Sequence, residues 1–402
     1  GELAVQVAEV AGLGRIRLSV TAGTPVVPPE PVSFQDGVLS NRHLKARIDP
    51  VSGDIVELST AGGTANLVDR HAGWALNSFV LLREDDVAHL GRSGEASVVV
   101  EDQGPLVATL RITSTAPLCN GLVRRLQLAA DQDFLELANT VDKQRAAYAA
   151  DADAKGRHPV RKESVQFAFP FDIPQGQLTI DVPFATVRPE LDQLPGSCKN
   201  WMPVGRWVDV SNDEVGVTWV TLDAPLIEVG GITATKLNSQ TDPEVWMRHL
   251  DPTQTFFSWV MNNHWGTNYR AWQEGPVTFR YALRPHGRAD AAEATRFATG
   301  LSQPLLVGAA SSEPGVREPL LRVEPADVIV QELKPSDDGE AWIVRLFNAS
   351  ATTAVAGVTW AKHARVSRMS RSDLAEQALG ELDDAIPLAA GELLTLRAPR
   401  GR

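Results

Sequence analysis

The sequence has few cysteines, no long apolar run and no basic cluster, and each of these would have indicated a protein class directly. Only two of its 402 residues are cysteine, so no disulfide framework organises the chain. No apolar run approaches the roughly 18 residues that span a bilayer. No cluster of Lys and Arg offsets a formal net charge of -12. We therefore expect no membrane partner and no nucleic-acid partner, and we expect Cys119 and Cys198 to be free thiols.

The first ten residues, GELAVQVAEV, also lack features that a natural start would have. They contain no initiator Met, no basic n-region and no apolar h-region. This start predicts that the chain was cut from within a longer protein. The sequence gives no indication of the cellular compartment.

Local motifs for catalysis and metal binding are few. The eight histidines form no HxH or HExxH pattern, and the one HxD pattern, His249 to Asp251, supplies only two of the three or four ligands that a zinc site needs to converge at about 2 Å. There is no GxSxG nucleophile turn and no phosphate-binding GxxxxGK[ST]. We therefore expect no metal site in this chain and assign it no catalytic residue.

What the sequence does contain is alternation of apolar and polar residues with a period of two, which is typical of half-buried antiparallel strands. Turn residues separate these segments. A single helix is predicted, with Asp290 as its N-cap and Gly300 as its stop signal. The fold class is therefore all-β and built from antiparallel sandwiches. Two buried faces are predicted, one of Leu106, Ala108, Leu110 and Ile112, the other of Val277, Phe279, Tyr281 and Leu283.

The length suggests two β domains, because one ordinary core rarely accommodates 402 residues. Residues 1–32 form a leading strand and a Pro-rich linker, and residues 33–301 form a large β domain. Residues 302–319 lose all periodicity and are rich in Pro and Gly, which predicts a linker. Residues 320–402 form a small C-terminal β domain.

One connection stands out in a chain with only 6 % aromatic residues: VMNNHWGTNYRAWQEGP, Val260 to Pro276. Two interpretations are open. Its amides could cap the loop's own backbone. Alternatively, its aromatic faces and amides could bind a sugar, which presents C–H faces and hydroxyls. Two further polar or aromatic segments contribute Glu163 and Trp207. The candidate ligand-binding residues are Asn262, Asn263, His264, Trp265, Asn268, Tyr269, Glu163 and Trp207.

The segment NNHWGTNYRAWQEGPVTFRYALRPH resembles the NNxWxTN region of glycoside hydrolase family 38, the α-mannosidases and their relatives. Other segments resemble the same family in the same order. They include NRHLKARIDPVSGDIVELS, EDQGPLVATLRITSTAP, RKESVQFAFPFDIP, GVTWVTLDAPLIEVG and ELKPSDDGEAWIVRLFNAS. The resemblance runs from about residue 12 to the end and covers the C-terminal β half of the family.

The resemblance implies a large supersandwich similar to galactose mutarotase, followed by a smaller β-sandwich. It also implies a longer parent protein of the retaining α-mannosidase type, with a zinc-binding catalytic half that this sequence does not match. On this basis the chain alone is inactive. Its partners are a mannoside-type glycan and its own N-terminal catalytic domain, and any zinc belongs to that domain.

Two alternative functions stay open. The chain could be a free-standing carbohydrate-binding β module. It could also be a mutarotase-like epimerase that uses histidine and a carboxylate as general acid and base. The second alternative requires His158, Glu163 and His264 to converge in one groove.

Overall fold

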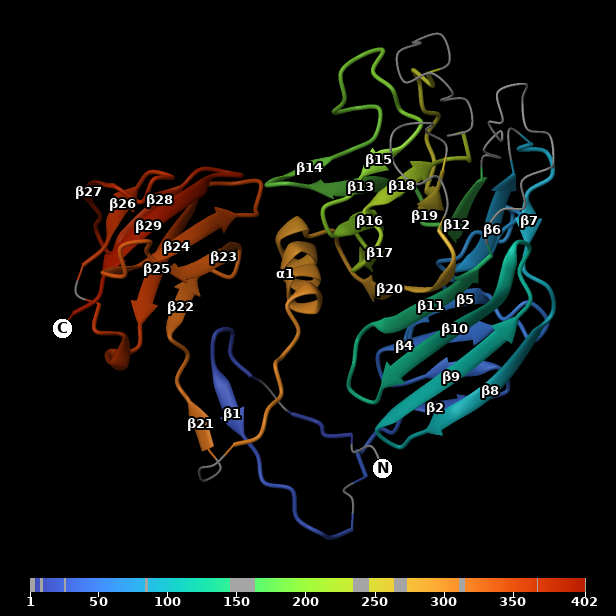
Figure 1. Cartoon of the computed structure of the whole chain (residues 1–402), viewed down its shortest axis with the longest axis horizontal. Coiled ribbons are helices and arrows are strands. Elements are labelled where there is room, and N and C mark those ends of the chain that lie inside the picture. The colour runs from blue at the N-terminus through green and yellow to red at the C-terminus, as the bar shows by residue number, and fades with distance from the viewer. Residues whose placement is uncertain are drawn as a thin grey trace, which may run out of the picture. The chain divides into compact units, whose positions relative to one another are not determined.

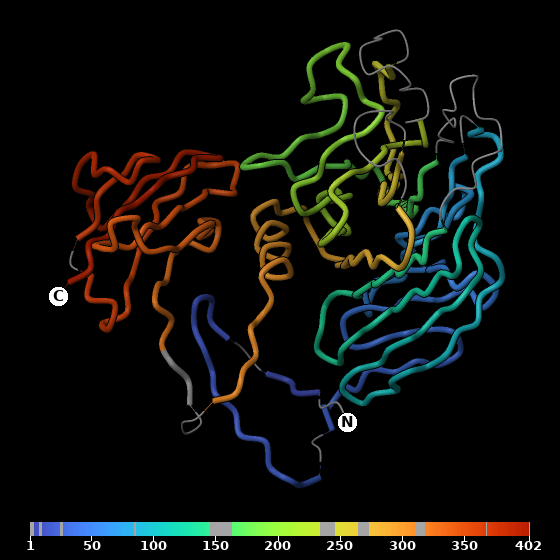
Figure 2. The backbone as a smooth tube through the Cα atoms, viewed as in Figure 1, coloured from blue at the N-terminus to red at the C-terminus, as the bar shows by residue number. Residues whose placement is uncertain are grey.

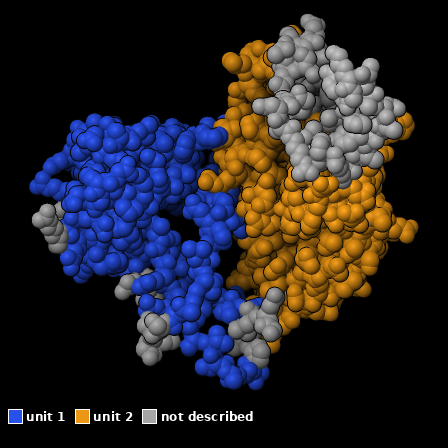
Figure 3. Space-filling view, in the orientation of Figure 1, with its two compact units in different colours: residues 1–25, 183–186, 290–402 blue, residues 26–182, 187–289 orange. Residues whose placement is uncertain are grey.

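The computed structural model describes residues 4–7, 10–24, 27–83, 86–144, 163–233, 246–263, 273–310, 315–366 and 368–401. The chain divides into two compact units (Figure 3). Unit 2 comprises residues 26–182 and 187–289, and unit 1 comprises residues 1–25, 183–186 and 290–402. Among the described residues, no helix combines the length and the hydropathy that a membrane span needs.

The largest sheet has nine strands, which are antiparallel where their registers are given. Its order is β14 (Ala185–Val187), β13 (Gln177–Val182), β16 (Trp207–Ser211), β17 (Gly216–Thr221), β20 (Gly275–His286), β11 (Leu135–Lys143), β10 (Cys119–Ala129), β9 (Val107–Ser114) and β8 (Ala96–Gln103). Eight of these strands lie within unit 2, whereas Ala185 and Thr186 of the edge strand β14 belong to unit 1. Figure 2 shows the course of the backbone. The buried faces predicted for β9 and β20 are confirmed for six of their eight residues, because Ala108, Leu110 and Ile112 are 0 % exposed and Phe279, Tyr281 and Leu283 are buried. Leu106 and Val277, at the starts of the two segments, are only half-buried.

Two further sheets complete unit 2 (Figure 1). The six-stranded sheet runs β15 (Met202–Pro203), β18 (Leu226–Val229), β19 (Thr255–Asn262), β12 (Glu163–Pro170), β6 (Ser78–Arg83) and β7 (Gly91–Arg92). The four-stranded sheet runs β2 (Ser33–Gln35), β3 (Val38–Ser40), β4 (Leu44–Ile48) and β5 (Ile55–Thr60). The predicted all-β fold, with a large antiparallel sandwich before a smaller one, is confirmed.

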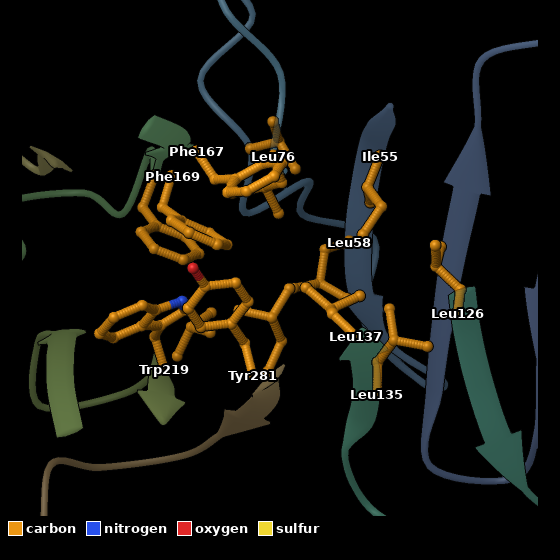
Figure 4. Packing of buried hydrophobic residues seen from close by; sticks show 14 of the residues in the cluster. Ile55, Leu58, Leu76, Leu126, Leu135, Leu137, Phe167, Phe169, Trp219 and Tyr281 are labelled. Carbon is orange, nitrogen blue, oxygen red and sulfur yellow. The ribbon is translucent and has the colours of Figure 1, made fainter. Parts of the chain in front are cut away.

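The core of unit 2 lies between these sheets and is rich in aromatic side chains (Figure 4). Phe169 of β12 contacts Trp219 of β17 and Tyr281 of β20, with ring centroids 5.3 and 5.4 Å apart. The Tyr281 hydroxyl is hydrogen-bonded to Ser258 Oγ at 2.9 Å, so this buried phenol is not left without a partner. Large rings at this position fill the space between the sheets and exclude water.

A buried arginine fixes the turn between β4 and β5. Arg124 of β10 is 0 % exposed; it pairs with the carboxylate of Asp54 and donates to the carbonyl of Ser52 at 2.5 Å. Gly53 lies between these two residues with a φ of +71°, and an added Cβ there would collide with the side chain of Ile112. Glycine is therefore required at this turn, because the backbone is left-handed and lies against the nine-stranded sheet.

Unit 1 contains the small β-sandwich and its own core. The three-stranded sheet runs β22 (Leu321–Glu324), β25 (Ala354–Trp360) and β28 (Ala385–Leu388). The five-stranded sheet runs β23 (Val328–Pro335), β24 (Ala341–Asn348), β29 (Leu393–Pro399), β26 (Ser370–Ser372) and β27 (Ala378–Glu381), and a 3-10 turn, η3 (Lys362–Ala364), follows β25. Outside the sandwich, β1 (Arg15–Arg17) pairs with β21 (Gly315–Arg317).

The single helix of the described residues, α1 (Ala291–Ser302), begins where the sequence predicts. The carboxylate of Asp290 caps it by accepting from the backbone N–H groups of Ala292 at 2.9 Å and Glu293 at 3.0 Å. The predicted stop at Gly300 is wrong, because the helix continues to Ser302 and its C-cap is Gln303. The reason is that a glycine terminates a helix only when the backbone turns left-handed there, and Gly300 has no positive φ.

We expect limited proteolysis of the folded chain to cut first between residues 302 and 310. Side chains from Ser302 to Ala310 are exposed, and Leu306 and Val307 are 98 % and 97 % exposed. Exposed segments without regular structure enter protease active sites most readily. Mass spectrometry of the first fragments checks this expectation. Earlier cutting within residues 192–212 would contradict it.

Candidate functional site at the ends of three strands

The ends of three strands of unit 2, β11, β12 and β19, meet beside the candidate ligand-binding residues Glu163 and Asn262. β11 ends at Lys143 and is paired there with Gly275, the first residue of β20. In the other sheet, β12 begins at Glu163, and Ser164 is paired with Asn262 at the end of β19. An ion pair between Lys143 and Glu163 joins the two sheets at this point. We call Lys143, Glu163, Asn262 and Asn263 the strand-end cluster.

Two of the predicted residues, Glu163 and Asn263, contact each other directly. The backbone N–H of Glu163 donates to Asn263 Oδ1 at 2.6 Å, and the backbone N–H of Asn263 donates to the carbonyl of Glu163 at 3.2 Å. Asn263 is 6 % exposed. Its side chain therefore extends the pairing of β12 with β19 by one residue.

The ion pair of the strand-end cluster is largely buried. Lys143 Nζ lies 2.7 Å from Glu163 Oε1, and the side chains are 3 % and 12 % exposed. The same Nζ donates to the carbonyl of Gln144 at 2.9 Å. Removing charges from water costs several kcal/mol per ion, which such a pair recovers only through close contact and further hydrogen bonds. The Lys143–Glu163 pair therefore stabilises the fold only where its close contact and hydrogen bonds offset this cost.

The charges of Lys143 and Glu163 also affect the pKa of the Cys119 thiol. Cys119 is paired with Lys143 in the register of β10 and β11. Burial raises the pKa of the Cys119 thiol to about 11, while Lys143 lowers that pKa and Glu163 raises it. Both cysteines are free thiols, as expected from the sequence.

We predict opposite changes in Cys119 reactivity when the two charges are removed. Glu163→Gln removes a negative charge, so the pKa of Cys119 falls and alkylation at a fixed pH near 9 becomes faster. Lys143→Met removes a positive charge, so the pKa rises and alkylation becomes slower. The measurement is the rate of reaction with iodoacetamide in a Cys198→Ser background. Equal rates in both variants would show that these charges do not act on the thiol.

Polar residues also lie on the outer face of the six-stranded sheet. Gln166 of β12 and Glu228 of β18 are 0 % exposed, and Gln166 Nε2 donates to Glu228 Oε2 at 2.5 Å across β19. Glu228 Oε1 accepts from the backbone N–H of Thr233 at 2.7 Å. Ser164 of β12 lies within 3.4 Å of Gln166 Nε2. This polar row begins beside the strand-end cluster and anchors residues 230–233 over the sheet.

Lys143, Gln166 and Glu228 were not among the residues predicted from the sequence. The signal for the last two was a polar residue inside a strand that is otherwise apolar, in ESVQFAFP and LIEV. Lys143 had no such signal, because a lysine at the end of a strand is usually exposed.

The other predicted residues have different outcomes. Asn262 is half-buried on β19. Trp207 is not part of the cluster: it lies on β16, opposite Val220 of β17, and is 1 % exposed. His264, Trp265, Asn268 and Tyr269 lie outside the described residues, as does His158. Of the three residues that an epimerase site would need, the structure describes only Glu163.

The described residues do not fit a zinc ion. Within the ranges that the structure covers, no three side chains among His, Cys, Asp and Glu come close enough to hold a metal. We therefore derive no chemical step through a metal in this chain.

Sequence comparison gives two matches, both to C-terminal domains of one family. Residues 39–224 match the glycosyl hydrolases family 38 C-terminal domain. Residues 327–396 match the glycosyl hydrolases family 38 C-terminal beta sandwich domain. A search of curated proteins gave no match.

Solved structures share the fold. An α-mannosidase from Enterococcus faecalis V583 superimposes with a TM-score of 0.68 at 13 % identity, covering 91 % of this chain and 42 % of that chain. A family 38 glycosyl hydrolase protein from Enterococcus faecalis gives 0.67 at 12 % identity, covering 94 % and 45 %. This chain thus spans less than half the length of either. A putative aldose 1-epimerase from Escherichia coli K12 matches over 64 % of this chain and 99 % of its own at 14 % identity, with a TM-score of only 0.37.

Proposed function

Because the chain belongs to glycosyl hydrolase family 38 through these C-terminal domains, we propose that it is the non-catalytic β region of an α-mannosidase-like glycoside hydrolase. In this role it packs against the catalytic half of a longer protein and helps to wall the sugar site. Its partners are then that catalytic half and a mannoside-type glycan. Zinc and the nucleophile belong to the catalytic half, and no residue described here takes part in bond breaking.

The observation that carries the proposal is the strand-end cluster. Glu163 and Asn263 hold each other through two hydrogen bonds. The predicted sugar-binding residues His264, Trp265, Asn268 and Tyr269 follow Asn263 in the sequence. A loop that begins at a buried, hydrogen-bonded position leaves the sheet in a defined direction. Residues of this kind orient a substrate and contribute equally to ground-state and transition-state binding. Catalysis by the longer protein depends on such positioning.

We expect the 402-residue chain alone not to hydrolyse p-nitrophenyl α-D-mannopyranoside, with or without added zinc. The reason is that both family matches are to C-terminal domains and that we assign no catalytic residue to this chain. Release of p-nitrophenolate is measured by its absorbance. The positive control is the longer protein encoded by the same reading frame, which should release p-nitrophenolate. Zinc-dependent turnover by the chain alone, abolished by a point change within it, would overturn the proposal.

A free-standing carbohydrate-binding module differs from this proposal in one measurable respect. A module of that class binds glycan with its full affinity when it is alone. The C-terminal region of a glycosidase supplies only part of a site, so its glycan affinity rises when the catalytic half is present. Isothermal titration of the chain and of the longer protein with the same mannoside separates the two.

A further inference from the structure

The ion pair of the strand-end cluster has hydrogen-bonding capacity that the described residues do not use. A lysine ammonium has three N–H donors. Lys143 Nζ has two partners among the described residues, Glu163 Oε1 and the Gln144 carbonyl. The carboxylate of Glu163 has a second oxygen, Oε2, and within the same ranges no hydrogen bond or ion pair reaches it. Among the described residues, one donor of Lys143 and one acceptor of Glu163 therefore have no partner, on two charged groups that are largely buried.

The two unused positions define the chemistry of a ligand. A sugar hydroxyl both donates and accepts a hydrogen bond. One hydroxyl can accept from the Lys143 ammonium while its neighbour on the ring donates to Glu163 Oε2. Both bonds are charge-assisted, which makes them stronger than bonds between neutral groups. Because the two charges cancel, the pair gives no net attraction to an anion or a cation, and a neutral polyol matches its donor and its acceptor.

We propose that Lys143 and Glu163 together bind two vicinal hydroxyl groups of a single sugar residue. This inference rests on the proposed function, because it names the group of the glycan that the strand-end cluster holds. It adds Lys143 to the site and gives Glu163 a specific role. Asn263 acts as a positioning residue, since it holds the backbone of Glu163 through two hydrogen bonds.

The competing explanation is that the ion pair only joins β11 to β12. A purely structural pair would show its effect in stability alone. A ligand-binding pair would also change affinity, and would do so in the same way as removal of one hydroxyl from the sugar. The second comparison leaves the protein unchanged, so it does not depend on whether a variant folds.

The test is a titration of the 402-residue chain with methyl α-D-mannopyranoside and with its 3-deoxy analogue, followed by NMR line shapes or calorimetry. The 3-hydroxyl belongs to both vicinal pairs of this sugar, so its removal breaks either. We expect saturable binding of the mannoside by the wild-type chain. The 3-deoxy analogue, Glu163→Gln and Lys143→Met should each weaken binding by about tenfold or more, as expected for a lost charge-assisted hydrogen bond. Circular dichroism and a melting curve establish that each variant is folded.

The control is Lys334→Met. Lys334 Nζ lies 2.6 Å from Glu376 Oε1 in unit 1, so this variant also removes a lysine from an ion pair with glutamate. Its affinity for the mannoside should equal that of the wild type. Absence of saturable binding by the wild-type chain would overturn the inference, and so would equal affinities for the mannoside and its 3-deoxy analogue. Folded Glu163→Gln and Lys143→Met variants with unchanged affinity would also overturn it. None of these results would remove the activity of the longer protein, so the proposed function is tested separately.

Discussion

Replacing Arg124 with methionine will lower the free energy of unfolding of unit 2 by about 3–5 kcal/mol, because it leaves the Asp54 carboxylate without its cation. Arg124 also donates to the carbonyl of Asn77 at 3.1 Å. The Asp54 carboxylate itself accepts from Ser78 Oγ at 2.5 Å. One substitution therefore leaves a largely buried charge and two backbone carbonyls with fewer partners. Methionine fills a similar volume, so the loss is electrostatic more than steric.

The matched control is Arg125→Met on the same strand. Arg125 pairs with Glu101 at 2.9 Å, but the side chains are 46 % and 32 % exposed, and an exposed ion pair contributes between 0 and about 1 kcal/mol. Urea denaturation followed by far-UV circular dichroism compares both variants with the wild type. A loss for Arg124→Met that stays within the error of Arg125→Met would show that Arg124 is not essential to the fold.

Replacing Trp265 with alanine in the longer protein will lower its activity on an aryl α-mannoside by about 100-fold, the effect of misplacing a substrate at a positioning residue. The melting temperature should fall little in comparison. The physical reason is that an indole that stacks on a sugar ring contributes to the bound state, whereas a core indole contributes to the folded state. The measurements are kcat/KM and a melting curve for the same preparation.

Two further variants serve as comparisons for Trp265→Ala. Trp219→Ala removes an indole that is 0 % exposed in the core, and should cost about 3–5 kcal/mol of stability. Asn268→Ala should reduce activity without a matching loss of stability, because an amide that binds a hydroxyl contributes to binding. If Trp265→Ala unfolds the chain while Asn268→Ala leaves the activity of the longer protein unchanged, the loop is only a structural element.

The architecture was accessible from the sequence because it depends on local patterns. Alternation placed Leu110 of β9 and Tyr281 of β20 on buried faces, and side-chain capping chemistry placed Asp290 before the helix. The same local rule failed at Gly300. A glycine lowers helix stability but does not end a helix by itself, so the surrounding packing decides where the last turn lies.

The site depended on contacts that no local pattern contains. The sequence singled out Glu163 and Asn263 separately, and the pairing of β12 with β19 makes them hydrogen-bond partners. Trp207 had the same aromatic character as other candidates, but its strand buries it.

Lys143 was not a candidate at all, because the sequence contains nothing that separates a lysine paired with a carboxylate from a solvated one. Only the stacking of two sheets brings the end of β11 against the start of β12, where Lys143 meets Glu163. Composition and periodicity thus determine which residues face the core. Which polar residues meet is decided by the register and stacking of strands that are far apart in the chain, since the free energy of a buried charge depends on its neighbours in space.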